Sequence, residues 1–550
     1  MILISVRYFG KAVGCFAGLF FLGGYKLYKK LKRVAFAFCV ALMTTASANA
    51  AEKIIYVPID NRPVNLVQVI DVADRLGYDL VTPPEEMLGS WDRTGDPDRI
   101  WEWVQQEASG AKAAVLSTDS LIYGSLVASR KHNLDEATIM DRAARLKTLH
   151  EEFPFLSIYA LSTIMRTPSY NSSVAMEAPY YATYGARIFE YTALKDKEEM
   201  GEAGAGDLRK IKKLEADIPA EYLTDWFGKR AKNYAANAYF IDLARGNSLR
   251  YLMLGCDDSA AYSQTHKESR HLTKLAEDLG KTRVIVASGA DELGMLMVAR
   301  AINDLKRDIP FLYIKYNEGE GGDTIPAYSN DKISNDLSAA ITAVGGILID
   351  SPQRAELVLA VSTNYDGKTF ESSSPRNNTK PRRGTETFLP ILKELVDKGY
   401  PVGLVDIATS NGADNALMNE LKKNGLQFRL RAYGGWNTAT NSSGFLIGSG
   451  VLTKWMSEND IYSLLLTRYL DDWVYQANVR QAVSAKIWEI PGEMKPPFLD
   501  GKWTGTSKET ERLVREFVEE NLKLPKGFAY RDLKVTLPWN RLFECDPRFD

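Results

Sequence analysis

The chain has 550 residues, with 68 basic and 70 acidic side chains, so its formal net charge is −2. A balance of this kind lacks the strong positive field with which proteins attract nucleic acids or anionic membranes, so we expect neither as a partner. Four cysteines in a chain of this length exclude a disulfide framework. The core must therefore come from hydrophobic burial, although Cys256 and Cys545 could still pair.

The first 50 residues predict a cleaved export signal. They contain seven basic residues and no acidic residue, and the basic cluster at 29–33 precedes an apolar run at 34–43. Small residues and the tripeptide Ala48-Asn49-Ala50 follow, as at a signal cleavage site. The alternative, a membrane anchor, needs a longer span of about 20 apolar residues. We expect cleavage after Ala50, a periplasmic or extracellular location, and no membrane contact after cleavage.

Beyond residue 50, short apolar runs alternate with amphipathic helices. A helix is expected over 64–76, after Pro63 and before Gly77, and others over 264–279 and 414–423. Most of the apolar runs are continuous, which is typical of parallel strands buried on both faces. The expected strands cover residues 54–59, 79–82, 113–117, 156–162, 251–255, 283–287, 311–315, 346–349, 357–361, 402–406 and 428–432.

This repetition of strand and helix predicts an α/β fold with a parallel sheet. The first eight or nine strands, in residues 51–365, suit a (β/α) barrel-like domain, with the Ala-, Lys- and Glu-rich stretch 185–247 as a helical insertion. Residues 366–452 are expected to form a smaller Rossmann-like region, and 453–550 a helical segment with one strand at 533–537. An alternative architecture, in which two α/β domains replace one extended barrel, also remains possible from the sequence.

Polar and charged residues follow seven of the expected strands. In parallel α/β folds the carboxyl ends of the strands meet at one edge, where ligands bind. Asp and Ser after a strand commonly cap the next helix, and Asn commonly holds a turn, but neither role calls for an arginine or a tryptophan. A polar small-molecule or sugar pocket does. The candidate site residues are Asp60, Arg62, Asp119, Arg166, Asp257, Asp258, Asp291, Glu292, Asn411, Trp436 and Asn437.

Several of these residues lie in longer motifs: YVPIDNRPVN at 56–65, LSTDSLIYG at 116–124, IMRTP at 164–168, GADE at 289–292, SNGAD at 410–414 and YGGWNTA at 433–439. With these motifs the chain resembles a bacterial family known only as a domain of unknown function, family 4127. The resemblance covers nearly all of the chain beyond the signal and implies no activity. Locally, Asp257-Asp258 also resembles the paired aspartates of barrel hexosaminidases that use substrate-assisted catalysis.

Paired carboxylates favour glycoside hydrolysis. One group protonates the leaving oxygen, and the second stabilises positive charge at the sugar carbon. Neighbouring residues of a strand point to opposite faces, so both aspartates can reach one pocket only if the strand has already ended. We expect Asp257 and Asp258 to be catalytic, with Asp258 as the acid. The arginines would bind substrate oxygens, Trp436 would stack on a sugar, and Asp60, Asp119 and Glu292 are rival carboxylates.

Two other functions remain open. The same aspartates suit a hydrolase that depends on a divalent metal, and two α/β lobes suit a non-catalytic periplasmic sugar-binding protein. The chain has no G-x-S-x-G elbow, no P-loop and no H-x-x-x-H spacing among its four histidines. We therefore expect a secreted carbohydrate-active enzyme with no cofactor, whose partner is a small-molecule or oligosaccharide substrate.

Overall fold

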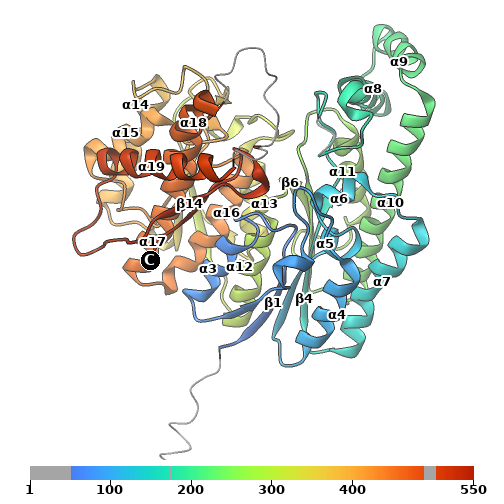
Figure 1. Ribbon diagram of the computed structural model, residues 1–550, viewed down its shortest axis with the longest axis horizontal. Coiled ribbons are helices and arrows are strands. Elements are labelled where there is room, and N and C mark those ends of the chain that lie inside the picture. Colours follow the sequence, from blue (N-terminus) through green and yellow to red (C-terminus); the bar gives the residue numbers. More distant parts are fainter. Residues whose placement is uncertain (1–50, 173–175, 488–498, 500–502) are drawn as a thin grey trace, which may run out of the picture. The chain divides into compact units, whose positions relative to one another are not determined.

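In the computed structural model, two parallel sheets organise the chain (Figure 1). The structure describes residues 51–172, 176–487, 499 and 503–550, so the predicted signal at 1–50 lies outside the described residues. The first sheet has six strands in the order β2 (Asp79–Val81), β1 (Lys53–Val57), β3 (Ala113–Ser117), β4 (Ser157–Ile164), β5 (Tyr251–Cys256) and β6 (Val284–Ser288). The second has five, in the order β13 (Ala432–Gly434), β11 (Val402–Asp406), β9 (Leu357–Ser362), β7 (Phe311–Tyr316) and β8 (Ile347–Leu348).

The mixed α/β fold with parallel sheets is thus confirmed, but the strands divide differently from the prediction. Strand β7 pairs with β8 and β9 and not with β6, so the strands of residues 51–365 belong to two sheets. No strand pairing among the described residues closes either sheet into a barrel. Two short additional pairs complete the strands: parallel β10 (Phe370–Glu371) with β12 (Thr409–Ser410), and antiparallel β14 (Lys534–Thr536) with β15 (Asp546–Arg548).

Helices cover both faces of each sheet. On β1, Ile54 and Tyr56 belong to one buried cluster while Ile55 and Val57 belong to another, as the alternation of side chains along a strand requires. The outer face of the first sheet packs against α4 (Pro97–Ala108), α7 (Glu136–Glu152) and α10 (Ala220–Arg245). This double burial explains why the strands read as continuous apolar runs.

A layer of helices lies between the two sheets. Helix α12 (Leu293–Lys306) packs on β3 and β4, α16 (Ala439–Leu452) packs on β11 and β13, and the two helices pack on each other. They share one core cluster with α3 (Val67–Asp74) and α13 (Ile333–Ala343). One continuous core therefore connects the sheets, and Lys53–Asp550 form one compact unit.

Most of the remaining helices cover the far face of the second sheet or build a separate layer. The first group comprises α14 (Arg383–Asp397), α15 (Asn415–Asn424), α17 (Glu458–Arg468), the π-helix η5 (Tyr469–Val479), α18 (Arg480–Ile487) and α19 (Trp503–Asn521). Residues 185–247 hold most of α8 (Tyr181–Glu199) and all of α9 (Ala205–Asp217) and α10, which enclose a small core of their own. The other helices are α5 (Thr118–Ile122), α6 (Leu126–Lys131) and α11 (Gln264–Leu275).

No helix among the described residues is long and apolar enough to cross a membrane. The two cysteines that could have paired, Cys256 and Cys545, are both buried free thiols.

Candidate functional site

A cavity of about 380 Å³ lies where the carboxyl ends of several strands meet. Loops after β1, β4, β5 and β6 of the first sheet reach it, and so do loops after β12 and β13. Residues that are hundreds of positions apart in the sequence are therefore neighbours here, as expected at this edge of parallel sheets. Seven of the predicted site residues line the cavity: Arg62, Arg166, Asp257, Asp258, Asp291, Asn411 and Asn437.

Arg62 holds two buried carboxylates at one side of the cavity. Its Nε and Nη2 donate to Asp60 at 2.9 and 2.8 Å, and its Nη1 and Nη2 donate to Asp291 at 3.1 and 2.5 Å. Asp60 lies behind Arg62 and also accepts from Asn65 Nδ2 at 2.8 Å, while Asn437 Nδ2 donates to Asp291 at 3.0 Å. Burial raises the pKa of Asp291, and the charge of Arg62 opposes that rise.

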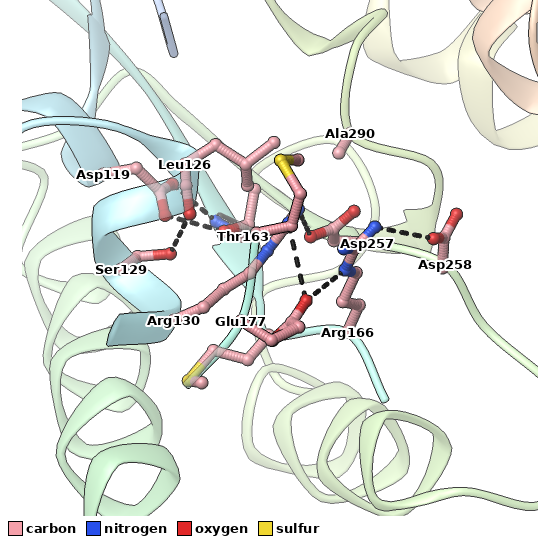
Figure 2. Close-up of polar contacts among 12 residues, drawn as sticks. Asp119, Leu126, Ser129, Arg130, Thr163, Arg166, Glu177, Asp257, Asp258 and Ala290 are labelled. Atoms are coloured by element: carbon pink, nitrogen blue, oxygen red, sulfur yellow. Dashed lines mark hydrogen bonds and ion pairs between the residues drawn. The ribbon is translucent and has the colours of Figure 1, made fainter. Parts of the chain in front are cut away.

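A second cluster forms on the side of β4 and β5 (Figure 2). Arg130 on α6 donates to Asp257, and its Nη1 lies 3.7 Å from Glu177 Oε1. Arg166, after β4, donates through Nε to the same Glu177 oxygen at 2.6 Å and through Nη1 to Asp258 at 3.3 Å. Glu177 thus lies between two arginines, each of which also contacts one aspartate of the pair. This arrangement fixes both guanidinium planes.

Asp257 and Asp258 both face the cavity because the strand has ended. Strand β5 stops at Cys256, although the Asp257 backbone N–H still donates to Ile164 of β4 at 3.2 Å. Asp258 has a φ of 45°, in the left-handed region, so it does not continue the alternation of the strand. The Asp257 side chain is 9% exposed and that of Asp258 is 31% exposed.

The surroundings of Asp258 favour its protonated form. Burial raises its pKa, and the charges of Asp257 and Asp291 add to that rise, while Arg166 and Arg130 lower it. Because Asp257 is more deeply buried and ion-paired with Arg130, the two neighbouring carboxyls have different environments. Such a difference lets paired carboxyls divide acid and base roles.

Four predicted site residues lie outside the cavity wall. Asp60 is behind Arg62, and Asp119 in α5 accepts from the backbone N–H and the hydroxyl of Thr163 at 3.0 and 2.7 Å. Burial raises the pKa of Asp119 to about 6. Glu292, at the start of α12, is buried against Gly444 of α16, and its pKa is raised well above the usual range by that burial. Trp436 packs on Phe543, with ring centroids 6.3 Å apart.

Two residues of the cavity wall are not among the site residues that the sequence predicts. Arg130 lies on a helix and not after a strand, and Trp539 follows the short strand β14, more than a hundred residues beyond Trp436. The guanidinium carbons of Arg62 and Arg541 lie 5.1 and 5.0 Å from the centroid of the Trp539 ring. The structure therefore offers Trp539, and not Trp436, as the tryptophan of the cavity. Tyr170, Tyr328 and Phe543 are the other aromatic side chains of its wall.

Among the residues that the structure describes, no three His, Cys, Asp or Glu side chains are grouped so that they could hold a metal ion. The cavity carboxylates instead contact arginines.

Fold and site together define an α/β protein with two parallel sheets and a polar cavity that is lined by arginines, aspartates and aromatic rings. The family model of the proteins of unknown function DUF4127 matches residues 54–547. The chain therefore belongs to the DUF4127 family, in agreement with the resemblance of its motifs. No curated protein is similar enough to the chain to count as a relative.

Proposed function

We propose that this protein is a carbohydrate-active enzyme, a glycoside hydrolase that acts through Asp257 and Asp258. The observation that carries the proposal is that both carboxyls reach one cavity from different environments. Asp258 is the acid that protonates the leaving oxygen, because its pKa is raised and its side chain is the more exposed of the two. Asp257, held by Arg130, stabilises the charge that develops at the sugar carbon or orients the attacking group.

The rest of the cavity wall suits a sugar. Trp539 lines the cavity with an indole that a pyranose ring can contact, and a hydrogen bond from its Nε1 to Asn61 Oδ1 at 2.7 Å fixes the ring. Asn411 and Asn437 both have a positive φ, of 59° and 54°, and their backbones are joined by a hydrogen bond of 2.7 Å. Two strand-end loops are thereby fixed side by side, as a binding wall of defined shape requires.

The proposal extends to location and partners. The basic, apolar and small-residue pattern of residues 1–50 supports export to the periplasm or beyond, where an oligosaccharide substrate is accessible. The cavity has mixed charge, and the sequence as a whole is slightly acidic, which supports neither nucleic acid nor an anionic membrane surface as partner.

The test is a screen of aryl glycosides and natural oligosaccharides, followed by variants on any substrate that is turned over. Asp258→Asn and Asp257→Asn should each reduce kcat/KM by about 100- to 10,000-fold, the usual contribution of acid–base groups. Asp141→Asn, which changes a side chain that is 79% exposed on α7, is the matched control and should be neutral. Full turnover by both cavity variants would exclude the mechanism.

A non-catalytic sugar-binding protein is the second candidate, and one observation favours it. Each aspartate of the cavity wall already contacts an arginine, as in a site that is built for rigid binding. The two functions differ in the fate of the ligand. An oligosaccharide that binds with 1:1 stoichiometry and is recovered unchanged after long incubation would identify the binding protein.

A further inference from the structure

The charge of the cavity wall carries information about the substrate. We propose that the cavity selects glycans that bear a protonated amino group over neutral and anionic glycans. This inference rests on the proposed carbohydrate function and concerns the substrate class of the same site.

Carboxylates outnumber arginines in the two ion-pair clusters. The first contains Arg62 with Asp60 and Asp291. The second contains two arginines with three carboxylates, namely Arg130 and Arg166 with Glu177, Asp257 and Asp258. Together the clusters contain three arginines and five carboxyl groups, which leaves one net negative charge while Asp258 is protonated and two when it is ionised. A substrate cation would offset this excess, and the effect is large where water is partly excluded.

The charges around these clusters do not reverse the excess. Arg541 is paired with Glu544. Farther out, Arg480 lies near Glu371. Lys131 lies on α6 next to Arg130, and the buried Asp119 lies near the same cluster of Arg130 and Arg166. These outer groups balance in number at a pH above about 6, where Asp119 is ionised.

Arg62 and Arg541 offer little to an anionic sugar. All three nitrogens of the Arg62 guanidinium donate to Asp60 or Asp291. Arg541 donates hydrogen bonds to Glu544 through Nε and Nη2. A uronate would have to compete with these carboxylates and would increase the negative charge of the wall, which is unfavourable for both reasons.

Two side chain amides of the cavity are also engaged. Asn437 Nδ2 donates to Asp291, and Asn411 Nδ2 donates to Glu371 at 2.8 Å. An acetamido carbonyl therefore finds these two donors occupied. By contrast, the Asp258 side chain is 31% exposed, and within the described part of the chain its only hydrogen bond is the one that Oδ2 accepts from Arg166. In its ionised form Asp258 is thus an available acceptor for an ammonium group, and a bound ammonium group would lower its pKa.

Aromatic rings complete a site for a cation. Tyr170 and Tyr328 line the cavity with Asp258, and the pKa of each phenol is raised chiefly by burial and in part by the Asp258 charge. The Tyr328 hydroxyl donates to Glu371 at 2.9 Å, which fixes its ring at this side of the cavity. A carboxylate that shares a cavity wall with aromatic rings is a combination that favours ammonium over neutral groups.

The test compares three oligosaccharides of equal length by calorimetric titration near neutral pH, where a bound ammonium group favours the ionised form of Asp258: oligomers of glucosamine, N-acetylglucosamine and galacturonate. We expect the glucosamine oligomer to bind at least about tenfold more tightly than the other two, with an advantage that shrinks as salt is added. Asp258→Asn should remove the advantage, whereas Asp141→Asn should keep it. Asn tolerates the left-handed conformation of residue 258, so the Asp258→Asn variant should fold, which its Tm will check.

The other outcomes separate this inference from the proposed function. Tighter binding of the acetylated oligomer or of the uronate would overturn the cation preference and leave a carbohydrate site in place. A preference for glucosamine that survives Asp258→Asn would also overturn it, because the charge excess would then not act through that carboxylate. Absence of binding by all three sugars would count against the carbohydrate function itself.

Discussion

Asp258 adopts a backbone conformation that disfavours most residues other than glycine, asparagine and aspartate, with a φ of 45°. This conformation ends the alternation of β5 and brings two consecutive carboxyls to one cavity. The proposed acid therefore depends on a single backbone angle as well as on its chemistry. Arg166 contacts it directly and is the nearest cation that controls its protonation.

Arg166→Gln tests this control. Burial raises the pKa of Asp258, and the positive charge of Arg166 lowers it, so removal of that charge should raise the pKa further. A general acid is active only while protonated, and its activity is lost as the pH rises through its pKa. The alkaline limb of the kcat/KM profile should therefore move to higher pH in the variant. An unchanged or downward-shifted limb would show that Asp258 is not the acid.

At the scale of single residues, the sequence predicts much of the cavity wall, because the carboxyl ends of parallel strands lie at the same edge of a sheet. It places Arg62, Asp258 and Asn437 there from their positions after strands. It cannot choose between Trp436 and Trp539, because only tertiary packing buries the first against Phe543 and exposes the second to the cavity. Arg130 could not be predicted as a site residue either, since it reaches the cavity from a helix and not from the end of a strand.

At the scale of elements, α12 and α16 join the two sheets through glycines. An added Cβ on Gly448 would lie 2.9 Å from Met295 Cγ and 3.0 Å from the Met295 carbonyl oxygen, and one on Gly444 would lie 2.4 Å from Glu292 Cγ. The helices can approach this closely only without side chains at these two positions. Because Glu292 and Asp291 are adjacent, this packing also positions the loop that carries Asp291 into the cavity.

Gly448→Ala should therefore destabilise the protein by about 1–3 kcal/mol, the usual range for overpacking of a tight core. Chemical denaturation measures this loss as a lower midpoint. Gly228→Ala is the matched control, since Gly228 lies within α10 and a Cβ there meets nothing within 4 Å. It should stabilise the protein by roughly 0.5–1 kcal/mol, because alanine favours a helix more than glycine does. Equal effects of the two substitutions would contradict the close packing of α12 on α16.

The elements themselves follow from local sequence more closely than their partners do. The expected helix at 414–423 corresponds to α15, which is capped by the Asp414 side chain and ended by Gly425 with a φ of 64°. The expected strand at 402–406 is β11, with the same bounds. Caps, glycines and apolar runs are local signals, so a single sequence reveals them.

At the scale of the whole molecule, the sequence leaves the pairing of strands undetermined. The inner strands of both sheets, such as β3 and β5 of the first and β9 and β11 of the second, are fully buried and equally apolar, so their composition does not say which neighbour they join. The chain changes from the first sheet to the second between β6 and β7, within the span that the sequence assigns to one barrel. Only the shared helical layer between the sheets, formed by segments far apart in sequence, distinguishes the two architectures.

The same layered core buries carboxyl groups throughout the molecule, and this sets a pH dependence of stability. Burial raises the pKa of Asp336, Asp406 and Asp472 to about 7, from a usual 3.8. A carboxyl with a raised pKa in the folded state leaves stability at its full value below about pH 4 and lowers it as the pH rises to about 7. His132, whose pKa is lowered to about 4 by burial, acts in the opposite direction over part of that range.

Asp336→Asn isolates one of these groups. Asp336 lies on α13, is 9% exposed and accepts from the Ser329 hydroxyl at 3.0 Å, a hydrogen bond that an asparagine side-chain oxygen can also accept. The free energy of unfolding of the wild type, minus that of the variant, should fall by up to about 4 kcal/mol between about pH 4 and pH 7. Urea denaturation at a series of pH values measures this difference, in which the contribution of His132 cancels. A difference that stays constant with pH would mean that Asp336 keeps its usual pKa in the folded protein, and one that rises would mean that its pKa is lowered; either would contradict the burial of this carboxyl.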